Sequence, residues 1–165
     1  MTQKKICMVG AYGTGKTSMV QRFVYSKFSE KYHSTVGVKI DRKEVSAGSS
    51  RVTLLLWDLA GQDRFESVQA SYLRGSAGII FVVDGTRRET LVELADLRQL
   101  AQTVLGPVPA VVAANKGDLE DQWQVRDDEL ASLSAEGLYV LKTSAKTGAR
   151  VDEAFLWLAQ QTLVS

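Results

Sequence analysis

Residues 10–18 read GAYGTGKTS, and this stretch decides how the rest of the chain is interpreted. It fits the spacing G-x-x-x-x-G-K-[ST] with Gly10, Gly15, Lys16 and Thr17. The glycines let backbone N–H groups curl around phosphate oxygens without interference from a Cβ atom, and the lysine adds a point charge for the outer phosphates. The threonine hydroxyl suits a Mg²⁺ ligand. The stretch predicts a phosphate-binding loop, and the alternative is a merely flexible turn.

The flanks of this loop support the prediction. The apolar run KKICMVG (residues 4–10) precedes it and predicts a strand, in which Cys7 is a buried residue rather than a reactive thiol. Residues 16–28 follow as a predicted helix, so the positive end of a helix dipole would face the anion. The other loop residues expected to contact the nucleotide are Tyr12, Gly13, Thr14 and Ser18.

Along the rest of the chain, apolar runs alternate with segments of helical periodicity. Residues 36–45 and 50–58 predict two strands joined by the turn-rich SAGSS. Further strands are expected at 76–86, 110–118 and 138–146, and helices at 87–105, 126–137 and 151–163. About six strands and five helices in alternation predict an α/β domain with a mostly parallel sheet, one antiparallel edge strand and helices on both faces. We expect a single domain over residues 1–165.

Composition narrows the class of protein. Of the 165 residues, 45% are hydrophobic and 24% are charged, as in an ordinary globular domain. The formal net charge of +1 gives no strong positive field that would attract nucleic acid or an anionic membrane. The single cysteine excludes a disulfide framework and fits a reducing compartment. No apolar stretch approaches a membrane span, and no C-terminal cysteine or second-position glycine is available for lipid attachment. We therefore expect a cytoplasmic protein without a lipid anchor.

A second motif, NKGD at residues 115–118, bears on the nucleotide base. It follows a predicted buried strand, and α/β sheets place ligand contacts at the carboxyl ends of their strands. A carboxylate such as Asp118 accepts two parallel hydrogen bonds from the ring N–H and amino group of guanine, and adenine cannot donate both. The motif favours a guanine nucleotide over ATP.

With these motifs the chain resembles the small GTPases of the Ras superfamily, most closely the Rab-like members, over nearly its whole length. GAYGTGKT resembles their phosphate loop, KYHSTVGVKI (residues 31–40) switch I, WDLAGQDRF (57–65) switch II, and NKGD and TSAK (143–146) the guanine loops. The resemblance implies the P-loop NTPase fold of small G proteins, GTP or GDP with Mg²⁺ as cofactors, and hydrolysis of GTP to GDP and phosphate.

The resemblance also implies roles for the metal and for hydrolysis. Thr17 and Thr35 would bind Mg²⁺, and Asp58 would hold it through water. The residues implied for hydrolysis are Gln62, which would orient the attacking water, and Gly61 and Lys16, which would meet the γ-phosphate.

Base and phosphate contacts follow from the same resemblance. Phe28 matches the aromatic residue that packs against the base, and Tyr32 matches the tyrosine that lies over the phosphates. The guanine loops would contribute Asn115, Lys116, Asp118, Ser144, Ala145 and Lys146.

The stretch after switch II resembles Rab proteins in particular. Trp57 and Tyr72 match two of the three aromatics that Rab proteins show to effectors, and the third position is Ile40. Together with Phe65, these residues form the expected surface for effectors, exchange factors and GTPase-activating proteins. The alternative for Trp57 is packing on the sheet. DGTRRETL (residues 84–91) and the absence of an anchor resemble the Rab-like GTPases of prokaryotes.

Tyr12 departs from the family, which has glycine or another small residue at this place. One interpretation is that the side chain crowds Gln62 or blocks an arginine from an activating partner, which would slow hydrolysis. The other is that it swings outward and changes little. The leading function is a switch that GTP orders and hydrolysis releases. The alternatives are a GTP-binding platform that barely hydrolyses and, disfavoured by NKGD, an ATP-dependent phosphotransferase.

Overall fold

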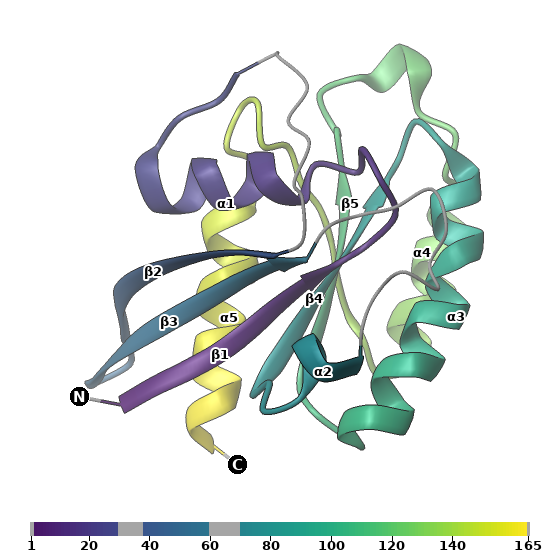
Figure 1. The fold of residues 1–165 in the computed structure, drawn as a ribbon. Helices are drawn as coiled ribbons and strands as arrows, with labels where there is room; N and C mark the ends of the chain where they lie inside the picture. Colours follow the sequence, from purple (N-terminus) through teal and green to yellow (C-terminus); the bar gives the residue numbers. More distant parts are fainter. Residues whose placement is uncertain (1, 30–37, 60–69, 165) are drawn as a thin grey trace.

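The computed structural model of the chain describes residues 2–29, 38–59 and 70–164 (Figure 1). Strands and helices alternate along it as the sequence predicts. The strands are β1 (Thr2–Val9), β2 (Val38–Ala47), β3 (Ser50–Leu59), β4 (Gly78–Asp84), β5 (Ala110–Asn115) and β6 (Tyr139–Lys142). The helices are α1 (Lys16–Tyr25), α2 (Ala70–Leu73), α3 (Arg88–Leu105), α4 (Asp127–Ala135) and α5 (Val151–Val164), with a short 3₁₀ turn, η2, at Glu120–Gln122.

The six strands form one sheet in the order β2-β3-β1-β4-β5-β6. β2 and β3 pair antiparallel and every other neighbouring pair is parallel, so the predicted α/β architecture is confirmed. The hairpin closes at Gly48–Ser49, where Ala47 pairs with Ser50. Gly48 has φ +65°, a value suited to the first central position of a tight hairpin turn.

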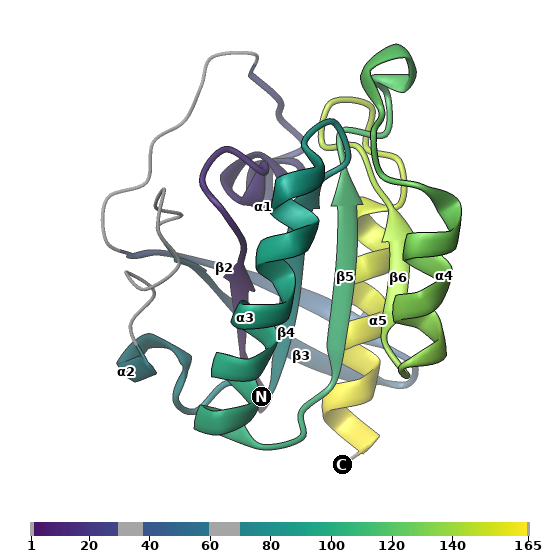
Figure 2. The same ribbon diagram turned by 90° about the vertical axis from the view of Figure 1, so that its right-hand side faces the viewer.

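Helices cover both faces of the sheet (Figure 2). Side chains alternate along β1, so Ile6 and Met8 pack with α1 and α5, while Cys7 and Val9 pack with α2, α3 and α4. β4 is buried along its whole length, as its continuous apolar run predicts for a strand covered on both sides. The two helical layers thus hold the sheet as a rigid platform.

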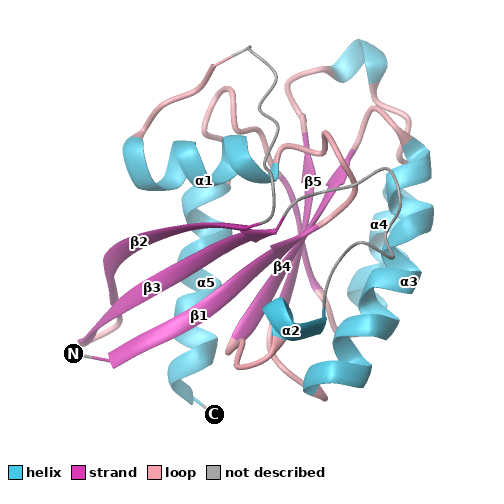
Figure 3. Ribbon diagram, in the orientation of Figure 1, coloured by secondary structure: helices cyan, strands magenta, loops and turns pink. Residues whose placement is uncertain are grey.

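Four strands, β1, β4, β5 and β6, end earlier than the predicted runs, and the excess residues form the loops. β5 ends at Asn115 and β6 at Lys142, which leaves the rest of NKGD and all of TSAK outside the sheet. α1 ends at Tyr25 because Ser26 adopts φ +55° and its N–H returns to Arg22 O. Figure 3 shows the loops after β1, β4 and β5 gathered at one end of the sheet, where the carboxyl ends of its parallel strands lie.

Stacked aromatic side chains join α5 to α1 and to β6. Phe155 of α5 is fully buried and stacks on Phe23 of α1, with ring centroids 4.2 Å apart. Trp157 is half-buried and stacks on Tyr139 at 4.4 Å. Cys7 is buried, with Ser76 Oγ donating to its Sγ at 3.0 Å, so the structural interpretation of this cysteine is confirmed. Among the described residues, no helix combines the length and apolar character needed to cross a membrane.

Candidate functional site

The loop between β1 and α1 is packed so closely that a Cβ atom at two of its glycines would clash with a neighbouring residue. A Cβ on Gly10 would lie 2.3 Å from Val82 O, and one on Gly15 would lie 2.2 Å from Asn115 Nδ2. Gly15 also has φ +102° at the N-cap of α1, and Gly13 has φ +77°. The motif spacing therefore reflects backbone that must approach its neighbours and turn where side chains do not fit.

Lys16 is a buried cation at the start of α1. It is 6% exposed, and its Nζ donates to Gly10 O at 3.1 Å and Ala11 O at 3.2 Å. Burial lowers the pKa of Lys16 to about 8, Asp58 opposes this effect and Arg87 adds to it. An anion against this ammonium would offset its desolvation, as a phosphate would.

Thr17 and Asp58 meet across the gap between α1 and β3. Thr17 Oγ1 donates to Asp58 Oδ2 at 2.5 Å, and Asp58 is 1% exposed at the end of its strand. A hydroxyl and a carboxylate are the hard oxygen donors that Mg²⁺ prefers, so these residues fit the predicted metal site. Thr35, the other predicted ligand, lies outside the described residues.

Asn115 joins the phosphate loop to the base loops. It is 2% exposed, and its Nδ2 donates to Thr14 O at 3.0 Å. Its Oδ1 accepts from Thr143 Oγ1 at 3.1 Å and from the Ala145 N–H at 3.2 Å. A single side chain thus fixes the spacing between the loops predicted to hold phosphate and guanine.

The two predicted guanine loops also contact each other directly. Ser144 Oγ donates to Asp118 Oδ1 at 2.7 Å and accepts from the Thr147 N–H at 3.1 Å. From α1, Arg22 Nε donates to Ala145 O at 2.8 Å and its Nη2 donates to Lys146 O. The carboxylate of Asp118 is therefore held in one orientation at the carboxyl edge of the sheet.

The loops after β1, β5 and β6 thus contact one another at one edge of the sheet, and comparison with known proteins shows the family. A model of the Ras family matches residues 5–164. The chain belongs to the Ras family. Ras-family members are small GTPases, so the protein binds GTP and GDP with Mg²⁺ and hydrolyses GTP.

The relatives place this GTPase beside the Rab proteins. Ras-related protein Rab-4B of Homo sapiens is 39% identical over 161 residues, which cover 96% of this chain and 76% of that protein. Ras-related protein Rab-4A of Homo sapiens is 38% identical over 164 residues, covering 96% and 74%. Ras-related protein Rab-13 of Canis lupus familiaris is 32% identical over 162 residues, covering 97% and 80%. The predicted Rab-like character is thus confirmed, and the prokaryotic origin stays a prediction.

The structure describes only part of the predicted site of the GTPase. Phe28 is half-buried and packs against the core on the α1 side of the sheet. Ser18 lies in the first turn of α1 and is also half-buried. The predicted residues outside the described part of the chain are Tyr32, Thr35, Gly61, Gln62 and Phe65.

Two residues of the expected effector surface lie on paired strands. Ile40 is 50% exposed and lies opposite Trp57 across β2 and β3. Trp57 is half-buried, packs with the core residues beneath α2 and α3, and carries Lys5 Nζ 3.7 Å from its ring centroid. Tyr72 of α2 packs against the same cluster. The sheet-packing interpretation of Trp57 is therefore observed, while Ile40 is open to a partner.

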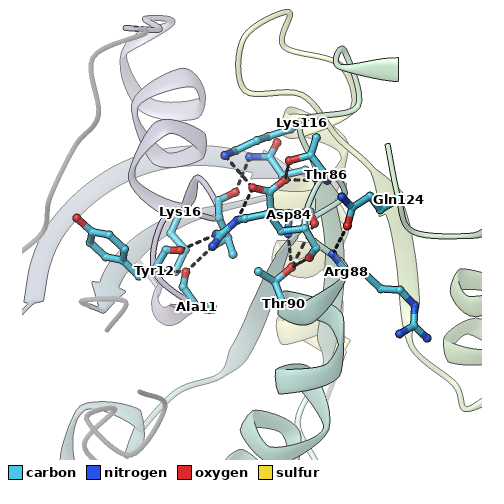
Figure 4. Close-up of polar contacts among 12 residues, drawn as sticks. Ala11, Tyr12, Lys16, Asp84, Thr86, Arg88, Thr90, Lys116 and Gln124 are labelled. Carbon is cyan, nitrogen blue, oxygen red and sulfur yellow. Dashed lines mark hydrogen bonds and ion pairs between the residues drawn. The ribbon is translucent and has the colours of Figure 1, made fainter. Parts of the chain in front are cut away.

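Sequence reasoning missed a buried carboxylate beside the phosphate loop. Asp84 lies at the end of β4 and is 1% exposed (Figure 4). Its Oδ1 accepts hydrogen bonds from the N–H and the Oγ1 of Thr86. Its Oδ2 accepts from Arg87 Nε at 3.1 Å and from Lys116 Nζ at 2.8 Å. Burial acts to raise the pKa of Asp84, but the hydrogen bonds from Lys116 and Thr86 lower it below its ordinary value. The available signal was its place at a strand's carboxyl end, on the same edge as Asn115.

Proposed function

We propose that this GTPase is a molecular switch in which GTP orders the two switch segments, hydrolysis releases them, and effectors bind the ordered form. The observation that carries the proposal is the position of Asn115, which ties the phosphate loop at Thr14 to the base loop at Ala145. Base and phosphates of one nucleotide would thus be held at a fixed separation by one rigid edge of the sheet. The whole chain, residues 1–165, would form this single domain.

The phosphate end of the site would be built by α1 and β3. Lys16 would offset the charge that develops on the phosphate oxygens, together with backbone N–H groups of the loop. Thr17 and Asp58 would hold Mg²⁺, with Thr35 as a further ligand, and the ion would supply positive charge at the β and γ phosphates. Gln62 would orient the attacking water.

The base end would be built by the loops after β5 and β6. Asp118 would accept both donors of the guanine edge, in the orientation that Ser144 Oγ fixes. Lys116 and Phe28 would pack along the base. This assignment of phosphate and base to separate loops is supported by the hydrogen bonds that hold the loops to one another.

Tyr12 would slow hydrolysis in this proposal. Its side chain is 37% exposed, and Figure 4 shows the ring extending away from Lys16 and Asp84. This direction agrees with the interpretation in which the ring swings outward and leaves the phosphate site open. Slower hydrolysis would then come only from its bulk on the outer side of the loop, where an activating partner's arginine would approach. The alternative function, a GTP-binding platform with little hydrolysis, is favoured by the same tyrosine.

Partners would bind the face that carries Ile40, Trp57 and Tyr72, and Phe65 is a further predicted contact. The exposure of Ile40 supports this role, because an exposed apolar side chain gains most from burial in a complex. A cytoplasmic location, suggested by composition, stays a prediction.

The test is one turnover of radiolabelled GTP by the wild-type protein beside Tyr12→Gly. Slow wild-type hydrolysis that glycine accelerates severalfold would mean that Tyr12 prolongs the GTP state. Equal rates of GTP hydrolysis in the two proteins, with and without an activating partner, would contradict the role of Tyr12. The protein would then be a switch whose GTP state lasts as long as its own hydrolysis allows. GTP binding without turnover in either protein would favour the platform.

A further inference from the structure

The loop between β4 and α3 places a second cation against the phosphate loop, in addition to Lys16. Arg87 Nη2 donates to Tyr12 O at 2.6 Å, and Arg87 Nε donates to Asp84 Oδ2 at 3.1 Å. Two different nitrogens of one planar guanidinium are engaged, so the group is fixed in orientation as well as in position. Its anchor, Asp84, is itself held by Thr86 and is almost fully buried.

This contact determines which way a peptide group of the phosphate loop faces. In a planar trans peptide the N–H points opposite to the carbonyl oxygen. Because Tyr12 O is bound by Arg87, the N–H of Gly13 is directed away from Arg87. Gly13 has φ +77°, and a glycine moves between backbone conformations at little cost, so the bond from Arg87 helps to fix this peptide.

The same carboxylate connects the guanidinium to the guanine motif. Lys116 Nζ donates to Asp84 Oδ2 at 2.8 Å, so both cations share one oxygen atom. Figure 4 shows this chain of contacts running from Lys116 through Asp84 to the backbone at Tyr12. A change at the base loop therefore has a direct route to the phosphate loop that does not pass through the nucleotide.

We propose that Arg87 is a positioning residue that orients the Tyr12–Gly13 peptide for binding of the β-phosphate, and that Asp84 couples it to Lys116. The inference rests on the proposed role of residues 10–17 in holding phosphate. Arg87 acts through the backbone, so removing it weakens the phosphate contacts of the loop more than the contacts of the base, which it reaches only through Asp84 and Lys116.

The test compares nucleotides with and without a β-phosphate. In Arg87→Ala we expect GDP to dissociate about tenfold faster, the effect of losing one charge-assisted hydrogen bond. The affinity for GMP, measured by displacement of a fluorescent GDP, is expected to stay within about twofold, since GMP lacks the β-phosphate that the Tyr12–Gly13 peptide would bind. Arg87→Lys recovers part of the loss, because an ammonium reaches one acceptor but lacks the fork that holds both.

A matched control lies next in the chain. Arg88 is exposed and bonds to Glu129 Oε2 at 2.6 Å, away from the loop, so Arg88→Ala is expected to leave GDP dissociation unchanged. As a second readout, protein labelled with ¹⁵N-glycine shows the amide signal of Gly13 in the GDP complex. We expect this signal to move more than any other glycine signal in Arg87→Ala.

Three outcomes overturn the inference: unchanged GDP dissociation in Arg87→Ala, equal losses for GDP and GMP, or an unmoved Gly13 signal. Lys16→Ala separates this failure from failure of the phosphate site. If Lys16→Ala lowers GDP affinity and Arg87→Ala does not, the site stands and the role of Arg87 fails. If neither variant lowers it, the proposed phosphate loop fails with it.

Discussion

The ring of Trp123 lies against Gly85 so closely that a Cβ on this glycine would come 1.9 Å from the ring. The N–H groups of Gln124 and Val125 both donate to Gly85 O, at 2.7 and 3.2 Å, and Lys142 Nζ lies 4.3 Å from the centroid of the indole. The segment after η2 is therefore clamped to the residue that follows Asp84. Trp123 acts as a cover for the strand end that carries the Asp84 contacts.

Gly85→Ala is expected to destabilise the GDP-bound protein by about 1–3 kcal/mol, because the indole must leave a closely packed position. Denaturant unfolding at saturating GDP measures the change. The control is the same substitution in a Trp123→Ala background, where the added methyl group has room and its cost falls. An equal cost in both backgrounds would place the origin of the effect in the backbone instead of the ring.

Asp84→Asn is expected to lower the unfolding free energy by about 1–3 kcal/mol at neutral pH, because it leaves Arg87 and Lys116 facing each other without a carboxylate. The expected loss of unfolding free energy is small because the side chains of Arg87 and Lys116 are 39% and 35% exposed, so water screens their charges. Thr86→Ala removes a hydroxyl donor to Asp84 but no charge, so it should lower the unfolding free energy by less than Asp84→Asn does.

The pH dependence of that difference has a defined sign. Because the pKa of Asp84 is lower in the folded protein than in the unfolded chain, its stabilisation is present above the unfolded pKa and is lost as the pH falls through the folded one. The gap between wild type and Asp84→Asn should be constant from pH 8 to about pH 5 and shrink only below about pH 4. A gap that closes between pH 7 and 6 would point to another group.

The sequence predicts those features of the fold that depend on residues close together in the chain. The spacing of Gly10, Gly15 and Lys16 is a local requirement of a loop that curls around an anion, and the alternation of apolar runs follows from burial of strands and helix faces. The bond from Arg87 to Tyr12 joins residues 75 apart, and nothing in the sequence near either one indicates it. Trp123 sits in a polar segment, so only the folded chain shows that it covers Gly85.

Boundaries were predicted less well than elements, and the reason is visible at the site. NKGD continues an apolar strand in the sequence, yet the strand stops at Asn115 and Lys116 adopts φ +68°. A left-handed conformation at a lysine is costly without compensation, and the ion pair with Asp84 offsets it here. The compensating residue lies on a neighbouring strand, so no local pattern contains it.

In Thr17→Ala, the Mg²⁺ concentration that half-maximally slows GDP release is expected to rise about tenfold, because the predicted ligand oxygen and its bond to Asp58 are both lost. Release of a fluorescent GDP, followed over a titration of free Mg²⁺, gives the value. Thr17→Ser keeps the hydroxyl and should behave like wild type. If both variants need the raised Mg²⁺ concentration, the methyl group and not the oxygen matters at this position, and if neither does, Thr17 is not a Mg²⁺ ligand.

Asp118→Asn is expected to exchange the preferred base. In the proposed site the carboxylate would accept from both the ring N–H and the amino group of guanine, whereas an amide offers one acceptor and presents a donor to the second group. The loss for GDP should be about 2–4 kcal/mol, a factor of roughly thirty to a thousand in affinity. Xanthosine diphosphate, which carries a carbonyl where guanine has the amino group, should bind the variant better than it binds wild type.

Ser144→Ala provides the matched comparison for this base test. It keeps the carboxylate but removes the hydroxyl that donates to Asp118 Oδ1 at 2.7 Å, so GDP should weaken by about 1 kcal/mol with no gain for the xanthine nucleotide. Competition of the two diphosphates against one fluorescent GDP analogue measures both variants on one scale. A xanthine preference in Ser144→Ala, or none in Asp118→Asn, would mean that the guanine edge is read by another group, because only the carboxylate distinguishes the two bases in this arrangement.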